Sequence, residues 1–155
     1  MLKNITVMAG AAMLLAGAGE AEAAFKTLTF EQRIASKGAG PLRDQDSLLV
    51  IGRIGKGPGA VANTASFQAH TNTLSVTAAW VVGTDFRLVG VNIDLVDNRG
   101  DIVASDNFTG LLSGFATSTF TASGLKVGQP YKLVLKGTAE GIAAYQITVT
   151  PSNAP

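Results

Sequence analysis

One histidine is the only residue of this 155-residue sequence whose ordinary pKa suits a general base near neutral pH. His70 stands in the polar run Gln68-Ala-His-Thr-Asn72. A serine hydrolase would combine such a histidine with a carboxylate and a serine nucleophile. Ser113 lacks the leading glycine of a G-x-S-x-G turn, so no catalytic site is predicted. The alternative is an exported hydrolase of an unfamiliar family that uses His70 with Asp44 or Asp46.

Oxygen-bearing side chains are densest between residues 94 and 107. The group comprises Asp94, Asp97, Asn98, Asp101, Asp106 and Asn107. Calcium binds through six to eight oxygen ligands, so the four aspartates (Asp94, Asp97, Asp101 and Asp106) are candidate metal ligands. Their spacing does not match an EF-hand loop, and aspartates in turns also hydrogen-bond their own backbone. We expect no required cofactor, and calcium is the one ion that this segment suits.

The composition excludes several classes of chemistry and of partner. Cysteine is absent, which excludes a disulfide scaffold, a thiolate nucleophile and a cysteine-ligated zinc site. Only 15% of residues are charged, against about a quarter in an ordinary globular protein. The net charge is +1 and the sequence has no concentration of positive charge for phosphates, so no nucleic-acid partner is expected.

The first 23 residues have the pattern of a secretory signal peptide. Lys3 precedes an apolar stretch from Ile5 to Gly19, and Ala21-Glu-Ala23 fits a cleavage site. An apolar stretch of about 15 residues is shorter than the roughly 20 that span a bilayer. We predict cleavage after Ala23, a secreted or periplasmic protein, and no membrane contact afterwards. The mature chain would carry 11 basic and 9 acidic residues, a net charge of +2.

Alternation of apolar and polar residues predicts β-strands after the signal. Residues 89–95 alternate with period two, and the turn residues Asp97-Asn-Arg-Gly100 lead into a second strand from Ile102, as in a β-hairpin. The same alternation recurs in the C-terminal third of the chain. It predicts that seven residues line the core: Val91, Ile93, Leu95, Leu133, Leu135, Tyr145 and Ile147.

Turn signals every 8 to 12 residues or so predict a sandwich or barrel of short strands. We expect one domain over residues 24–155, an all-β, antiparallel β-sandwich of jelly-roll type with about seven to nine strands. Residues 30–37 are expected to form a short helical turn that ends at Gly38. The glycines near residues 52–65 are expected to form an irregular loop.

Three runs in the C-terminal half share a family pattern. The first combines an apolar strand, a D-x-x-G turn and a short second strand, the second approximates L-x-x-G-x-Y-x-L-x-V, and the third approximates G-x-Y-x-L-x-V. They are Val91–Asp106, Ala122–Leu135 and Gly141–Val149. Residues 73–149, which contain them, resemble bacterial pre-peptidase C-terminal domains and small secreted proteins of the FxDxF type. The run Phe67-Gln-Ala-His-Thr lacks the acidic residue of an F-x-D-x-F motif, and Gln129 and Pro130 stand where the family usually has one residue.

The resemblance implies a non-catalytic jelly-roll sandwich, since such domains are appendages or extracellular proteins, some of which bind matrix polymers. A strand with Thr117, Thr119 and Thr121 on one face offers hydroxyls and few charges. We therefore expect a non-catalytic secreted bacterial protein with a binding or structural role in the extracellular matrix or at the cell surface. Its expected partners are a polysaccharide or a surface protein.

The stretch Phe25-Lys-Thr-Leu-Thr-Phe30 reads as a peripheral strand outside the family-like segment. Such a strand either covers an edge of its own sandwich or adds to the edge of a neighbour. We expect it to cover its own edge, in a protein that is mostly monomeric with weak self-association.

Overall fold

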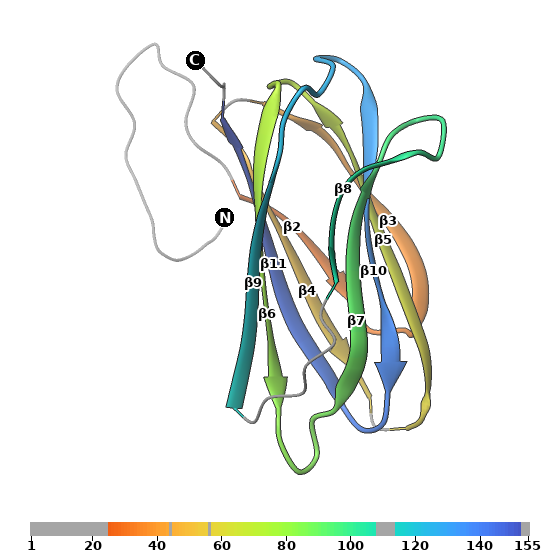
Figure 1. Cartoon of the computed structure of the whole chain (residues 1–155). Coiled ribbons are helices and arrows are strands. Elements are labelled where there is room, and N and C mark those ends of the chain that lie inside the picture. Colours follow the sequence, from red (N-terminus) through yellow and green to blue (C-terminus); the bar gives the residue numbers. More distant parts are fainter. Residues whose placement is uncertain (1–24, 44, 56, 108–113, 153–155) are drawn as a thin grey trace.

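The computed structural model describes residues 25–43, 45–55, 57–107 and 114–152 (Figure 1). Within them the chain forms β-strands and no helix, and so no helix there is long and apolar enough to cross a membrane. The expected signal peptide, residues 1–23, lies outside the described residues. The strands are β2 Phe25–Phe30, β3 Ile34–Leu42, β4 Ser47–Ile54, β5 Gly59–Ala69, β6 Thr73–Val82, β7 Leu88–Val96, β8 Ile102–Asn107, β9 Gly114–Ala122, β10 Pro130–Ala139 and β11 Ala143–Ser152.

The strands form two five-stranded sheets that pack face to face (Figure 1). The first sheet has the order β3-β5-β10-β7-β8, and the second sheet has the order β2-β4-β11-β6-β9. Apart from the β7–β8 hairpin, each strand is followed in sequence by a strand of the opposite sheet. The expected all-β sandwich is therefore confirmed, with ten described strands where seven to nine were expected.

Two pairings at one side of the sandwich are parallel, and the other six are antiparallel as expected. β2 pairs with β4, and β3 pairs with β5. The strand between the members of each pair lies in the opposite sheet, so the chain makes a crossover and returns in its original direction. β2 thus covers an edge of its own sandwich, as expected for Phe25–Phe30.

Two local expectations are wrong. The helical turn expected at 30–37 is replaced by the strand β3, and the irregular loop expected near 52–65 is reduced to residues 55–58. A short helix is marginal by itself, whereas β3 gains a ladder of backbone hydrogen bonds to β5. The glycine-containing ends of β4 and β5 are likewise held by β11 and β10. In both segments tertiary pairing overrides local preference.

The core lies between the two sheets, where the alternation of the sequence places it. Leu133 is opposite Leu95 and Leu135 is opposite Ile93 in the β10–β7 pairing. All seven residues predicted for the core are buried, which confirms that prediction: Val91, Ile93, Leu95, Leu133, Leu135, Tyr145 and Ile147. Burial of a side chain of this size stabilises the fold by about 1.5–3 kcal/mol.

A buried hydrogen bond joins the two sheets through this core. The Tyr145 hydroxyl of β11 donates to Asn63 Oδ1 of β5 over 2.6 Å. Asn63 Nδ2 donates in turn to the carbonyl oxygens of Gln32 and Arg33, at 3.0 and 3.1 Å. Burial raises the pKa of Tyr145, so the hydroxyl stays protonated and remains a donor. One polar chain thus connects the second sheet, the first sheet and the segment that crosses between β2 and β3.

The Tyr145 ring needs a glycine opposite it. Gly52 of β4 is the register partner of Tyr145, and a Cβ atom at Gly52 would lie 1.9 Å from Cε2 of the ring. The ring is buried and its hydroxyl is held by Asn63, so it has little room to move. Glycine at this position therefore sets the orientation of the inter-sheet hydrogen bond.

We predict that Gly52→Ala lowers the free energy of unfolding by about 1–3 kcal/mol, the cost of overpacking a filled core. Urea denaturation measures this loss. Gly83→Ala is the matched control, because a Cβ atom there meets no atom within 4 Å. The control should be as stable as the parent protein, or slightly more stable through its stiffer unfolded chain. Equal stability of the two variants would contradict the role given to Gly52.

Candidate functional site

The predicted hairpin turn forms, and Asp97 holds it from within. The backbone N–H of Asp97 donates to Asp101 O over 2.9 Å, and that of Gly100 donates to Asp97 O over 3.1 Å. The Asp97 carboxylate accepts hydrogen bonds from the backbone N–H groups of Arg99 and Asp101, at 2.9 and 3.0 Å. Gly100 has a φ of 88°, a value that favours glycine. The carboxylate therefore acts as a turn cap.

The other candidate calcium ligands lie apart from this cap. Asp94 accepts a 2.8 Å hydrogen bond from the hydroxyl of Ser105, its partner across the β7–β8 ladder. Asp106 follows Ser105, so its side chain points to the opposite face of the strand from that of Asp94. Asp101 pairs with Arg99 over 3.5 Å. Among the described residues no three His, Asp or Glu side chains gather as they would around a metal ion, and calcium binding remains an untested prediction.

The pH dependence of stability provides a test of the turn cap. The backbone N–H of Asp101 is the main cause that holds the pKa of Asp97 below its ordinary 3.8. A lowered folded-state pKa means that the carboxylate stabilises the fold above pH 3.8, and that this contribution disappears as the pH falls through the folded-state pKa. We predict that Asp97→Asn lowers the melting temperature at neutral pH and that its difference from the parent protein disappears in acid.

Thermal melts over a pH series, with and without a chelator, check this prediction. The turn-cap role requires the same pH-dependent difference in both conditions. A melting temperature that falls with chelator in the parent protein but not in Asp97→Asn would instead indicate a bound ion.

The structure does not assemble the alternative hydrolase site from described residues. His70 is exposed just beyond β5, and it forms no hydrogen bond or ion pair with the described part of the chain. The Asp46 carboxylate is buried and accepts hydrogen bonds from the backbone N and the Nε of Arg43, at 3.1 and 3.2 Å. Asp44 lies outside the described residues. Asp46 is thus committed to its own turn.

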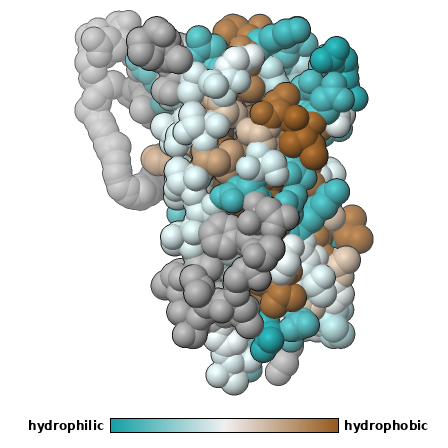
Figure 2. Space-filling view, viewed as in Figure 1, coloured by the Kyte–Doolittle hydropathy of each residue, from teal (hydrophilic) through white to brown (hydrophobic). Residues whose placement is uncertain are grey.

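The outer face of the second sheet is rich in hydroxyl groups. The expected face of β9 is exposed, and the neighbouring strands extend it with threonine and serine. We call this surface the hydroxyl face, and it comprises Thr27, Thr29, Ser47, Ser75, Thr77, Thr117, Thr119, Thr121, Thr148 and Thr150. Figure 2 shows mostly pale residues, of intermediate hydropathy, along the β9 side of the molecule.

Register places the hydroxyls of this face in rows across the strands. Thr148 of β11 is opposite Thr77 of β6, which is opposite Thr119 of β9. The Thr77 and Thr119 hydroxyl oxygens are 3.2 Å apart and hydrogen-bonded. Neighbouring strands are about 4.8 Å apart, and same-face residues recur about every 6.6 Å along a strand. The face therefore presents donors and acceptors at repeated spacings in two directions.

One charged side chain interrupts this neutral surface. Among the described outward-facing positions of the second sheet, Arg53 of β4 is the single charged residue. It is exposed and forms no ion pair with described residues. Sequence reasoning identified only the β9 part of the face. The period-two placement of threonine in Phe25–Phe30 and in Ala143–Ser152 was the available signal for the rest.

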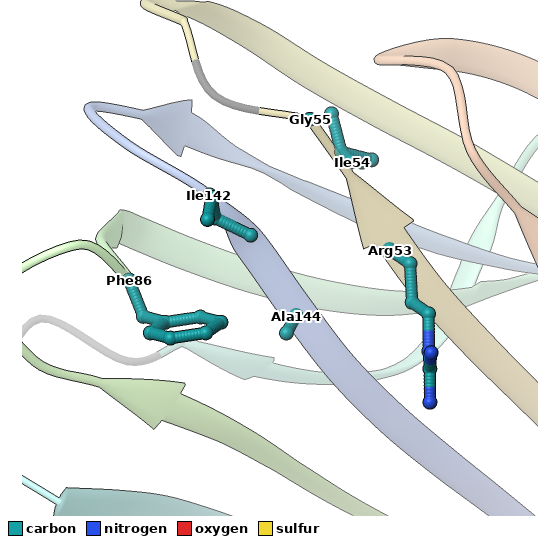
Figure 3. Close-up of a pocket in the computed structure, with 6 residues that line it drawn as sticks. All are labelled: Arg53, Ile54, Gly55, Phe86, Ile142 and Ala144. Carbon is teal, nitrogen blue, oxygen red and sulfur yellow. The ribbon is translucent and has the colours of Figure 1, made fainter.

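A hollow of about 480 Å³ opens beside Arg53, at one end of this sheet. Ala144 lies in it with Phe86 and Arg53 on opposite sides, as Figure 3 shows. Its described lining consists of Arg53, Ile54, Gly55, Phe86, Ile142 and Ala144. A second hollow of about 300 Å³ shares Arg53 and Ala144 and continues toward Ala79 and Gln146. The two hollows are thus neighbours, and the second lies beside Gln146 and Ala79, which lie in one register row with Thr117 of the hydroxyl face.

Backbone contacts fix the position of Phe86 at this end. The Phe86 carbonyl accepts a 2.8 Å hydrogen bond from the N–H of Gly83, and Phe86 forms a bridge with Ile142. A Cβ atom at Gly141 would lie 2.7 Å from Asp85 O, so glycine allows the two segments to approach. The aromatic ring is therefore placed by the β6–β7 and β10–β11 connections together.

Comparison with known proteins yields no family for this chain. No protein-family model and no curated protein matches it. The similar solved structures include the pre-peptidase C-terminal domain of collagenase from Bacillus anthracis, at 10% identity and a TM-score of 0.40, over 77% of this chain and 99% of that one. They also include the periplasmic inhibitor PliG of g-type lysozyme from Aeromonas hydrophila, at 10% identity and a TM-score of 0.40, over 81% and 97% of the two chains.

A third similar structure is that of infectious bursal disease virus strain Gt, at 17% identity and a TM-score of 0.37, over 71% of this chain and 30% of that one. The first of the three is a domain of the type that residues 73–149 resemble, and the FxDxF type is not among the three; at these identities and TM-scores none of them assigns a family to the chain. Similarities this distant carry no function. The site must therefore be interpreted from its own chemistry, as a neutral hydroxyl-bearing sheet face that ends in a hollow with one arginine.

Proposed function

We propose that this protein is an exported, non-catalytic β-sandwich that binds a polysaccharide of the extracellular matrix or cell surface through its hydroxyl face. The observation that carries the proposal is the row of register partners Thr148, Thr77 and Thr119 on a face with one charge. The targeting pattern of residues 1–23 supports export.

The chemistry of this face suits a polymer that is itself covered with hydroxyls. Each threonine offers one donor and two acceptor positions, which match the hydroxyls of a sugar without burying a charge. The β-branched threonine side chain is stiff at χ1, so ordering it on binding costs little entropy. Single contacts of this kind are weak, but a repeating polymer engages many of them at once.

Co-sedimentation of the purified exported protein with a panel of insoluble polysaccharides tests this proposal. We predict that a polysaccharide of the panel retains the protein and that the double variant Thr77→Val, Thr119→Val weakens its binding about fivefold or more. Loss of two net hydrogen bonds of about 0.5–1.5 kcal/mol each accounts for that factor. Because both partners of the Thr77–Thr119 hydrogen bond are replaced together, neither hydroxyl is left unpaired by the other's loss.

Thr64→Val is the matched control, since Thr64 lies on the outer side of β5 in the first sheet. It should bind as the parent protein does. Equal weakening by the control, or binding that is unchanged in the double variant, would show that the hydroxyl face is not the binding surface. Retention by surface proteins and by no polysaccharide would favour the other expected partner class.

The same assay also tests the alternative that the protein is a hydrolase. Soluble sugars released from a polysaccharide by the parent protein, and lost in His70→Ala, would contradict the non-catalytic part of the proposal.

A further inference from the structure

We infer that the hollow between Arg53 and Phe86 binds an acidic sugar, a uronate unit of the bound polymer. This inference rests on the proposed function and adds to it the class of sugar that the surface selects. It combines three observations on the described residues: a guanidinium without an ion pair, an aromatic ring opposite it, and a second hollow that shares Arg53 and Ala144 with the first.

The positive charge of Arg53 favours an anionic ligand in the hollow. Arg53 is exposed and forms no ion pair with described residues, and none of the described residues that line either hollow is acidic. The nearby Arg87 is already paired with Glu140 over 2.7 Å. A guanidinium presents parallel N–H groups that bind both oxygens of a carboxylate. Arg53 is therefore the free cation at this end of the sheet among the described residues.

The opposite wall of the hollow is apolar and favours a ligand with an apolar ring face over a simple ion. Phe86 lies across Ala144 from Arg53, and Ile142 and Ile54 complete an apolar lining (Figure 3). The C–H face of a sugar ring is apolar, and its burial against such a surface is favourable. A volume of about 480 Å³ is within the usual range for sites that hold small organic ligands. A uronate carries both required features, an apolar ring face and a carboxylate.

The second hollow gives the direction in which a polymer would continue from this unit. Arg53 and Ala144 belong to both hollows, and the second hollow reaches Ala79 and Gln146. Gln146 is opposite Ala79, and Ala79 is opposite Thr117 of the hydroxyl face. Sugars that follow the uronate would thus meet first an amide and then threonine hydroxyls.

The experiment measures binding of polygalacturonate and of the same polymer after its carboxyl groups are reduced to alcohols. We expect the parent protein to bind the carboxylate form at least tenfold more tightly. Arg53→Gln should lose that preference, so that it binds the two polymers equally. Arg53→Lys keeps the positive charge but lacks the parallel N–H groups of the guanidinium, so it should show an intermediate preference. Arg99→Gln is the control. It also removes one exposed positive charge, but Arg99 lies on the β7–β8 turn and lines neither hollow.

Several results would overturn the inference. A parent protein that binds both polymers equally, or an Arg53→Gln variant that retains the preference, removes the uronate site. In either case the proposed function stands if Thr77→Val, Thr119→Val still weakens binding. A preference that Arg99→Gln abolishes equally would reduce the effect to net charge. Unchanged melting temperatures in the variants ensure that each loss is one of binding.

A second titration separates the sugar from the carboxylate. Free galacturonate should compete with the polymer for the parent protein, and hexanoate at the same concentration should not. Equal competition by hexanoate would assign the hollow to small carboxylates and overturn the sugar part of the inference. If neither polymer binds and free galacturonate causes no Arg53-dependent change in melting temperature, the uronate inference fails. The proposed function is then decided separately, by the polysaccharide panel and the double variant Thr77→Val, Thr119→Val.

Discussion

The hydrogen bond between Tyr145 and Asn63 is the constraint on which the arrangement of the two sheets depends. A buried amide without partners is costly, so Asn63 must meet both the tyrosine hydroxyl and the carbonyls of the β2–β3 crossing. The apolar contacts of the core are not directional, whereas a hydrogen bond requires a defined distance and angle. A directional bond of 2.6 Å in the core, with Gly52 beneath the tyrosine ring, fixes which part of one sheet faces which part of the other.

The outer face of the second sheet takes no part in this hydrogen bond or in the core. Its threonines, such as Thr77 and Thr148, keep a high preference for the strand conformation and contribute nothing to the core. An ordinary antiparallel sheet carries charged residues on its solvent side, whereas here the described face has one. Removal of charge lowers the desolvation cost of contact with a neutral partner. The scarcity of charged residues in the chain is thus most evident on this face, where hydroxyl groups recur at regular spacings.

The end of that sheet adds a second, more selective element. Arg53 comes from a strand, and Phe86 from the connection between β6 and β7 that the β10–β11 turn holds in place. Because strand pairing and backbone hydrogen bonds hold the main chain of both walls, a ligand need not order that main chain on binding, and only the exposed Arg53 side chain would lose rotamer freedom. In the proposed function, the neutral hydroxyl face would supply contact area and Arg53 would fix the position of the polymer along it.

Local sequence was sufficient for features that depend on neighbours in the chain. Period-two alternation identified the core residues Leu95, Leu133 and Ile147, and the turn at Asp97 follows from the hydrogen bonds of one side chain to its own backbone. Only the tertiary structure decided that residues 34–42 form a strand, because their hydrogen-bond partners lie in β5. The same holds for the candidate site. Alternation tells which side of a strand a residue occupies but not which strands are neighbours. The row through Thr148 and the placement of Arg53 and Phe86 around one hollow therefore arise from long-range pairing alone.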